Sequence, residues 1–141
     1  MGAETASRVN QPRGLLLDTS VIIDLDELDL DDMIDVRTAV SAVTVAELAY
    51  GLDLGSAAQR AARAERFYGV VDAYRVLPFD TAAAKMYGVL AAMVRQAGRD
   101  PRPRRMDLQI AATAASNRLP LLTRNPDDVA GLDEVLTVLA L

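Results

Sequence analysis

The 141-residue sequence contains no histidine and no cysteine, and its only lysine is Lys85. These absences exclude a Ser-His-Asp triad, a cysteine nucleophile and a zinc site built from Cys and His. The chemistry that remains depends on oxygen ligands. Clustered carboxylates are the ligands that suit Mg²⁺ or Mn²⁺.

Long apolar runs are also missing, so no segment is expected to span a bilayer. Residues 1–13 lack the apolar stretch of a signal peptide, and we therefore expect a cytoplasmic protein with no membrane partner. Hydrophobic residues make up 51% of the chain, which predicts a globular protein rather than a disordered one. The length predicts one domain over residues 14–141, preceded by a loose segment at 1–13.

The charge is unevenly distributed along a chain whose net charge is −5. Eight of the twenty acidic residues lie between Asp18 and Asp35. Four arginines, in contrast, cluster just before Asp107: Arg99, Arg102, Arg104 and Arg105. A local basic patch can bind phosphate whatever the net charge, although a solvated loop would have the same composition.

Strand and helix patterns alternate along the sequence. Apolar or β-branched runs predict strands at Leu15–Leu17, Arg37–Val43, Tyr74–Leu77, Pro120–Thr123 and Leu136–Leu139. Helical patterns begin at Thr19, run from Thr44 through Gly51–Gly55, cover Ser56–Tyr74, extend from Asp80 to Gly98, occupy Met106–Asn117 and recur briefly near Asp127. Asp26–Asp35 is expected to be a surface helix or loop, and Asp100–Arg105 a loop. This alternation predicts an α/β fold with a central, mostly parallel sheet of about four or five strands and helices on both faces.

Four acids stand where these elements meet: Asp18, Glu47, Asp107 and Asp128. In a parallel sheet, ligands bind at the carboxyl ends of the strands, where such side chains would gather. Each acid also has a structural explanation. Asp18 could cap a helix, Glu47 could close a capping box that Thr44 opens, and Asp107 and Asp128 could interact with helix dipoles.

Polar neighbours of these acids could support them. Ser20, Thr123 and Asn125 have hydroxyl or amide groups, which can orient a carboxylate or a metal-bound water by hydrogen bonding. Arg104 and Arg105 would place cations beside Asp107, an arrangement that suits a polyanionic substrate held against a metal ion.

Five segments, taken together, resemble the sequence blocks of one known family. They are LLLDTSVII, SAVTVAELAYG, RVLPFD, MDLQIAATA and LLTRNPDDVAGL. In this order and spacing, from about Leu15 to Leu139, they are similar to the blocks of PIN-domain ribonucleases, and specifically of VapC-type toxins from toxin-antitoxin pairs.

The resemblance implies a set of site residues. In that family, three near-invariant acids and a more variable fourth surround one or two Mg²⁺ or Mn²⁺ ions; by motif these are Asp18, Glu47, Asp107 and Asp128. We expect Asp18 and Asp107 to bind metal directly, and Glu47 and Asp128 to hold water or a second ion. The fourth position is open, because Val129 replaces the usual aromatic residue and Asp127 or Asn125 could serve instead.

The resemblance also implies a function. It predicts a metal-dependent endoribonuclease toxin that cleaves RNA by metal-activated water, forms a homodimer and is inhibited by a cognate VapB-like antitoxin. Arg104 and Arg105 would contact the RNA backbone.

The alternatives are other α/β proteins. A non-catalytic PIN-like or receiver-like interaction module would share the fold, but a receiver domain needs an acid pair after its first strand and a lysine after its last. A haloacid-dehalogenase-like phosphatase needs two aspartates one residue apart, whereas Asp18 is followed by Thr19 and Ser20.

Overall fold

Five short parallel strands form the centre of the molecule in the computed structural model, which describes residues 14–24 and 37–141. The strands are β1 (Leu15–Leu17), β2 (Thr38–Ser41), β3 (Arg75–Leu77), β4 (Leu121–Thr123) and β5 (Val138–Ala140). Their order is β3-β2-β1-β4-β5, and every neighbouring pair is parallel. The expectations for residues 1–13 and for Asp26–Asp35 lie outside the described residues.

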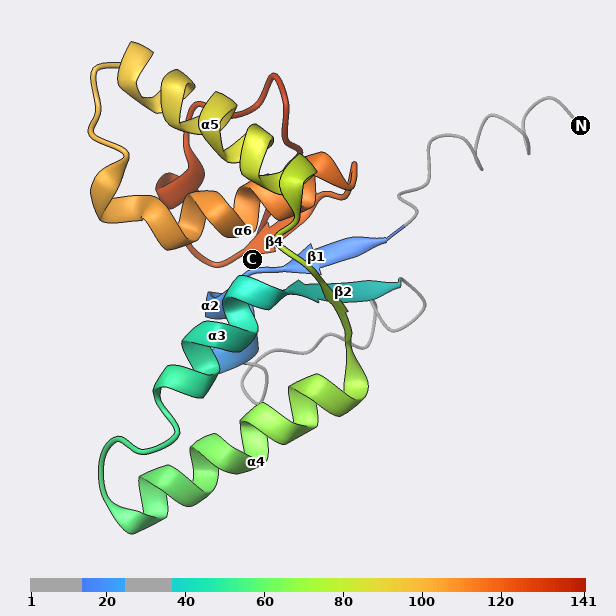
Figure 1. Ribbon diagram of the computed structural model, residues 1–141, viewed down its shortest axis with the longest axis vertical. Helices are drawn as coiled ribbons and strands as arrows, with labels where there is room; N and C mark the ends of the chain where they lie inside the picture. Colours follow the sequence, from blue (N-terminus) through green and yellow to red (C-terminus); the bar gives the residue numbers. More distant parts are fainter. Residues whose placement is uncertain (1–13, 25–36) are drawn as a thin grey trace, which may run out of the picture.

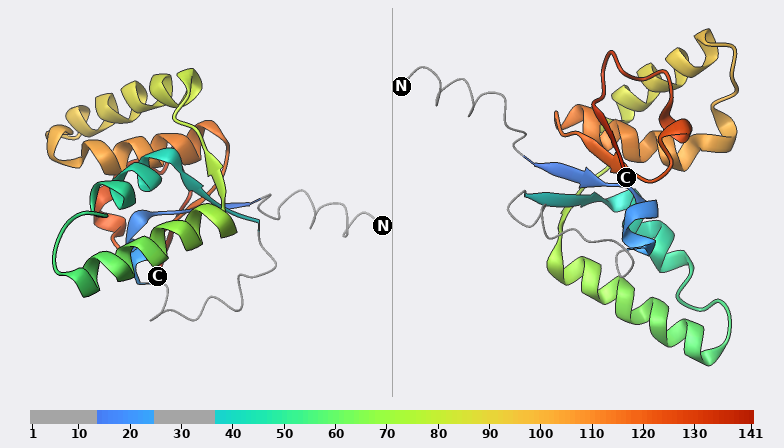
Figure 2. Two further views of the ribbon diagram at one scale, coloured as in Figure 1. Left: turned by 60° about the horizontal axis from the view of Figure 1, so that its bottom comes forward. Right: turned by 180° about the vertical axis from the view of Figure 1, so that it is seen from behind.

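Helices cover both faces of this sheet. They are α2 (Thr19–Ile23), α3 (Ala42–Tyr50), α4 (Ala57–Ala73), α5 (Thr81–Gln96) and α6 (Arg105–Ser116), with 3₁₀ turns η3 (Arg102–Arg104) and η4 (Pro126–Val129). Helices α5 and α6 lie side by side on one face, and α2, α3 and α4 lie on the other (Figures 1 and 2). The predicted α/β class, the parallel sheet and the two helical layers are therefore confirmed. No helix within the described ranges is long and apolar enough to cross a membrane.

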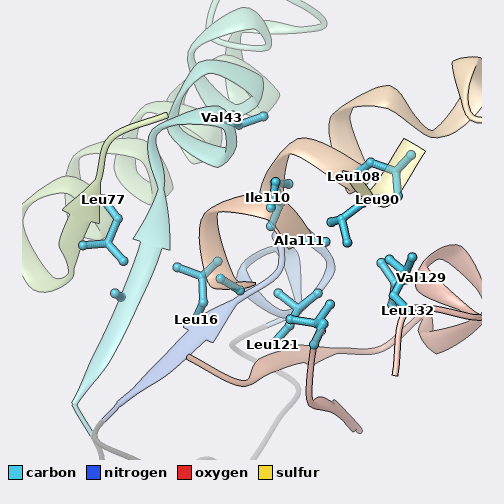
Figure 3. Packing of buried hydrophobic residues seen from close by; sticks show 14 residues of the cluster. Leu16, Val43, Leu77, Leu90, Leu108, Ile110, Ala111, Leu121, Val129 and Leu132 are labelled. Atoms are coloured by element: carbon cyan, nitrogen blue, oxygen red, sulfur yellow. The ribbon is translucent and has the colours of Figure 1, made fainter. Parts of the chain in front are cut away.

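The side chains of β1 supply both halves of the core. Leu16 points toward α5 and α6, where it packs in a cluster with Leu90 and Ile110 (Figure 3). Leu15 and Leu17 point the other way and pack with α2 and α4. This pattern explains why the strand is apolar throughout, as expected for a parallel strand that is covered on both faces. Apolar side chains of α5, the helix predicted from Asp80 to Gly98, also pack against the first cluster.

The start of α3 differs from the prediction. Strand β2 ends at Ser41, and α3 begins at Ala42 because the Ser41 hydroxyl accepts a hydrogen bond from the Val43 amide and caps the helix. The predicted strand to Val43 and the predicted Thr44–Glu47 capping box are therefore wrong. The helix also ends at Tyr50, before the predicted Gly51–Gly55 end.

Smaller shifts occur near the carboxyl terminus of the chain. The last strand begins at Val138 instead of Leu136, because the Leu136 amide bonds to the Leu132 carbonyl in a turn. Helix α6 begins at Arg105, one residue earlier than predicted, directly after the η3 turn.

The strand order places a topological switch point between β1 and β4. The chain proceeds from β1 to β2 and β3 on one side, and then returns to add β4 and β5 on the other. In open α/β sheets, the crevice outside the carboxyl ends of the strands at such a point is the usual ligand site. Asp18 follows β1 directly, and Thr123 ends β4.

Candidate active site

Asp18 is oriented by two hydroxyl groups. It is only 8% exposed and occupies the N-cap position of α2, but its side chain makes no capping bond. Instead, its Oδ2 atom accepts hydrogen bonds from Ser20 Oγ at 2.7 Å and from Thr123 Oγ1 at 2.9 Å. The carboxylate therefore bridges the two strands at the switch point. Among the described residues, no group hydrogen-bonds to its other oxygen, Oδ1.

Backbone amides set the direction of these hydroxyl groups. The Arg124 amide donates to Ser20 Oγ at 3.1 Å, and the Asn125 amide donates to Thr123 Oγ1 at 3.0 Å. Since each hydroxyl oxygen already accepts a bond, its hydrogen is free to point at Asp18. Ser20 and Thr123, two of the three residues expected to support the acids, both hydrogen-bond to Asp18. Asn125, the third expected residue, supports the site only through its backbone amide, which donates to Thr123. Its exposed side chain makes no hydrogen bond within the described ranges.

Glu47 lies on the second turn of α3 and is held by a chain of threonine hydroxyls. Thr19 Oγ1 donates to Glu47 Oε1 at 3.0 Å and lies 3.0 Å from Thr44 Oγ1. Because the Thr19 hydrogen is used on Glu47, the buried Thr44 must donate to Thr19. Sequence reasoning treated Thr19 only as the start of a helix. Its partner lies 28 residues away, so no local signal could have identified it.

Asp107 lies in the first turn of α6, as predicted. Burial raises its pKa, repulsion from Asp18 raises it further, and Arg104 opposes both effects. Burial also raises the pKa of Glu47, against the hydrogen bond from Thr19 and with repulsion from Asp107 and Asp18. Three carboxylates from three separate elements are therefore close enough to repel one another. Like charges in a partly desolvated site favour the binding of a cation.

Asp128 has a different environment. It is half-buried in η4, and its Oδ1 atom forms an ion pair with Arg104 Nη1. Asp127 is exposed, as is Arg105, which forms no ion pair with any described residue. The expected pair of arginines beside Asp107 is thus divided. Both arginines are exposed, but only Arg104 interacts with the acids, through its ion pair with Asp128 and its effect on the pKa of Asp107.

The donor atoms at this edge fit a hard divalent cation by their chemistry. Asp18, Glu47 and Asp107 offer carboxylate oxygens, which Mg²⁺ and Mn²⁺ prefer, and the chain has no His or Cys that could bind a softer metal instead. In the part of the chain that the structure describes, no three acids converge into a formed cation cage. The case for a divalent cation at this site therefore rests on the carboxylate ligands and on the repulsion among Asp18, Glu47 and Asp107.

The fold and this edge define a class: a parallel α/β domain with acidic side chains gathered at its switch point. Residues 15–134 match the PIN domain family. The chain therefore belongs to the PIN-domain family.

Individual relatives agree with this assignment. Ribonuclease VapC5 from Mycobacterium tuberculosis is 39% identical over 134 residues, which cover 90% of this chain and 93% of the relative. Ribonuclease VapC4 from the same organism is 33% identical over 129 residues, or 89% of this chain and 98% of that one.

Solved structures are similar as well. The crystal structure of VapBC-5 from Mycobacterium tuberculosis, a member of the VapBC family of toxin-antitoxin systems, matches with a TM-score of 0.75 and 37% identity, covering 92% of this chain and 98% of that one. VapBC2 from Rickettsia felis, bound to a DNA fragment from its promoter, matches with a TM-score of 0.73 over 90% of this chain and 98% of that one. At 18% identity, that likeness shows the fold alone.

Proposed function

We propose that this chain is a metal-dependent endoribonuclease and the toxin of a toxin-antitoxin pair. One observation carries the proposal: Asp18 is bonded across the switch point to Thr123 while Glu47 and Asp107 repel it and each other. The relatives VapC5 and VapC4, both named ribonucleases, support the choice of substrate and reaction.

Asp18 and Asp107 are the proposed direct ligands of Mg²⁺ or Mn²⁺, with Glu47 completing the site. A bound ion of this kind lowers the pKa of a water molecule and offsets negative charge on the phosphate that is attacked. Ser20 and Thr123 hold one oxygen of Asp18 and leave the other for the ion. Thr19 fixes the position of Glu47.

Arg104 and Arg105 are the proposed contacts to the RNA backbone. They lie at the start of α6, next to the proposed metal ligand Asp107, and both are exposed. Contacts of this type add affinity that depends on salt and read little sequence. The two residues would therefore hold the RNA near the acids without selecting the base that is cleaved.

A VapB-like antitoxin is the proposed protein partner. The similar chain from Mycobacterium tuberculosis is described as VapBC-5, a toxin-antitoxin system, and it covers nearly the whole of this chain. Because the similarity covers 92% of this chain at 37% identity, we infer that this chain also binds an inhibitory protein partner.

The experiment compares Asp18→Asn and Asp107→Asn with wild type. Each substitution removes one charge and keeps the size of the side chain. We expect RNA cleavage with Mn²⁺ to fall by at least about 100-fold and Mn²⁺ affinity to fall by at least about tenfold, because each variant loses a ligand charge. Cleavage would be followed on a labelled RNA, and Mn²⁺ binding by calorimetry. The matched control is Asp72→Asn, an exposed acid on α4 that should change neither quantity.

Two results would contradict the proposal. Undiminished RNA cleavage by wild type in excess EDTA would exclude metal dependence. Full cleavage by both variants, at unchanged melting temperature, would exclude these acids from the site.

A further inference from the structure

The ion pair between Arg104 and Asp128 joins two segments at the edge of the acidic site. Arg104 precedes α6 and Asp128 lies in η4, so the pair connects the helix that carries Asp107 to the turn that follows β4. The side chain of Arg104 is 46% exposed and that of Asp128 is 32% exposed. Arg104 also lowers the pKa of Asp107, so its positive charge acts on two of the four acids.

This pairing separates Asp128 from the other acids. Asp18, Glu47 and Asp107 repel one another, whereas Asp128 already has a cation beside it. A divalent ion at Asp128 would have to displace the guanidinium group or bind next to its positive charge. Both alternatives weaken binding, because ions of like charge repel and because the existing pair would be lost.

We propose that Arg104 is the permanent counter-cation of Asp128 and thereby restricts the site to one divalent ion, held by Asp18, Glu47 and Asp107. This inference rests on the proposed metal-dependent function. It assigns Arg104 a positioning role in addition to any contact with RNA. It also means that Asp128 is not a ligand of the first ion.

Counting bound Mn²⁺ tests the inference without RNA and without activity. Free Mn²⁺ gives an electron paramagnetic resonance signal that is lost on binding, so a titration yields the number of ions and their dissociation constants. We expect wild type to bind one ion tightly and a second only weakly, so that its titration shows one ion, and Arg104→Gln to show two. Since the pair is half-exposed, the dissociation constant of the second ion should be roughly tenfold lower in Arg104→Gln than in wild type.

Three further variants identify the cause. Arg104→Lys keeps the positive charge and should still bind one ion. Arg105→Gln removes the neighbouring exposed charge and should also bind one ion. The double variant Arg104→Gln with Asp128→Asn should return to one ion, because the second ion is expected to bind through Asp128.

The outcomes separate this inference from the proposed function. Two ions on wild type with comparable affinity, or one ion on Arg104→Gln, would overturn the role of Arg104 and leave the nuclease proposal intact. A second ion that persists in the double variant would overturn the assignment to Asp128. If wild type bound no Mn²⁺ at all, the proposed metal-dependent function would itself be wrong.

Discussion

Hydroxyl groups rather than charged groups position two of the acids in the site. Ser20 and Thr123 hold Asp18, and Thr19 holds Glu47 with the help of the buried Thr44. A neutral donor fixes the carboxylate without cancelling its charge, so the negative charge stays available for a cation. Groups of this kind that orient metal ligands typically change metal affinity by about 10- to 100-fold when they are removed.

Thr19→Val tests this role directly. The substitution keeps the shape of the side chain but removes the hydrogen bond to Glu47, so we expect Mn²⁺ affinity to fall by about tenfold. The melting temperature should fall as well, because Thr44 loses its partner in a fully buried position. Thr19→Ser restores the hydroxyl and should recover both quantities. A lower melting temperature with unchanged Mn²⁺ affinity would show that Thr19 only supports the fold.

The raised pKa of Glu47 predicts how stability depends on pH in the metal-free protein. Burial raises this pKa in the folded state above its unfolded value, so the ionised form destabilises the fold at neutral pH. The penalty is lost as the pH falls through the folded pKa and then below the unfolded value, where the carboxyl group is protonated in both states.

The substitution Glu47→Gln tests this pH dependence, because it removes the ionisable group and keeps the size of the side chain. In excess EDTA, we expect the variant to melt above wild type at pH 7, and the difference to shrink as the pH is lowered from 7 toward 4.5. The variant keeps an oxygen that can accept the bond from Thr19. A difference that did not change with pH would mean that ionisation of Glu47 does not destabilise the metal-free fold.

Among the elements, those with many apolar residues could be predicted from the sequence. Leu15–Leu17 is apolar at each position because it is buried on both faces, and the helix predicted from Asp80 to Gly98 packs its apolar side chains against the core as α5. The position of Asp107 in the first turn of α6 followed from the helical pattern that begins beside it. The apolar patterns along the sequence also predicted that strands and helices alternate, and the parallel sheet was predicted from that alternation.

Boundaries and distant polar contacts could not be predicted in the same way. Ser41 ends β2 and caps α3 at once, so the helix begins before the Thr44 signal that the sequence offered. The Thr19–Glu47 bond and the Arg104–Asp128 pair join segments that are 28 and 24 residues apart. Such contacts depend on how the elements pack, and one sequence contains no local pattern for them.

In the whole molecule, the hydrophobic clusters on the two faces of the sheet depend on the same strands. Leu16 is buried against α5 and α6, and Leu122 is buried against α2 and α4. Because both side chains arise from neighbouring strands, β1 and β4, loss of packing on either face should weaken the same sheet.

We expect Leu16→Ala and Leu122→Ala each to lower the free energy of unfolding by about 2–5 kcal/mol. Each variant should still unfold in one transition when urea denaturation is followed by circular dichroism and by tyrosine fluorescence. Val89→Ala, on the exposed side of α5, is the control and should change stability by less than about 0.5 kcal/mol. Separate transitions by the two probes would show that the two layers unfold independently.

The bond between Thr123 and Asp18 spans 105 positions of the chain. During synthesis, the ribosome therefore makes Asp18 105 residues before its hydroxyl partner. Strand β1 cannot pair with β4 before that moment, and closing such a long loop is among the later steps of folding for a parallel sheet. A nascent chain therefore contains Asp18, Glu47 and Asp107 before Thr123, whose hydroxyl group orients Asp18, has been made.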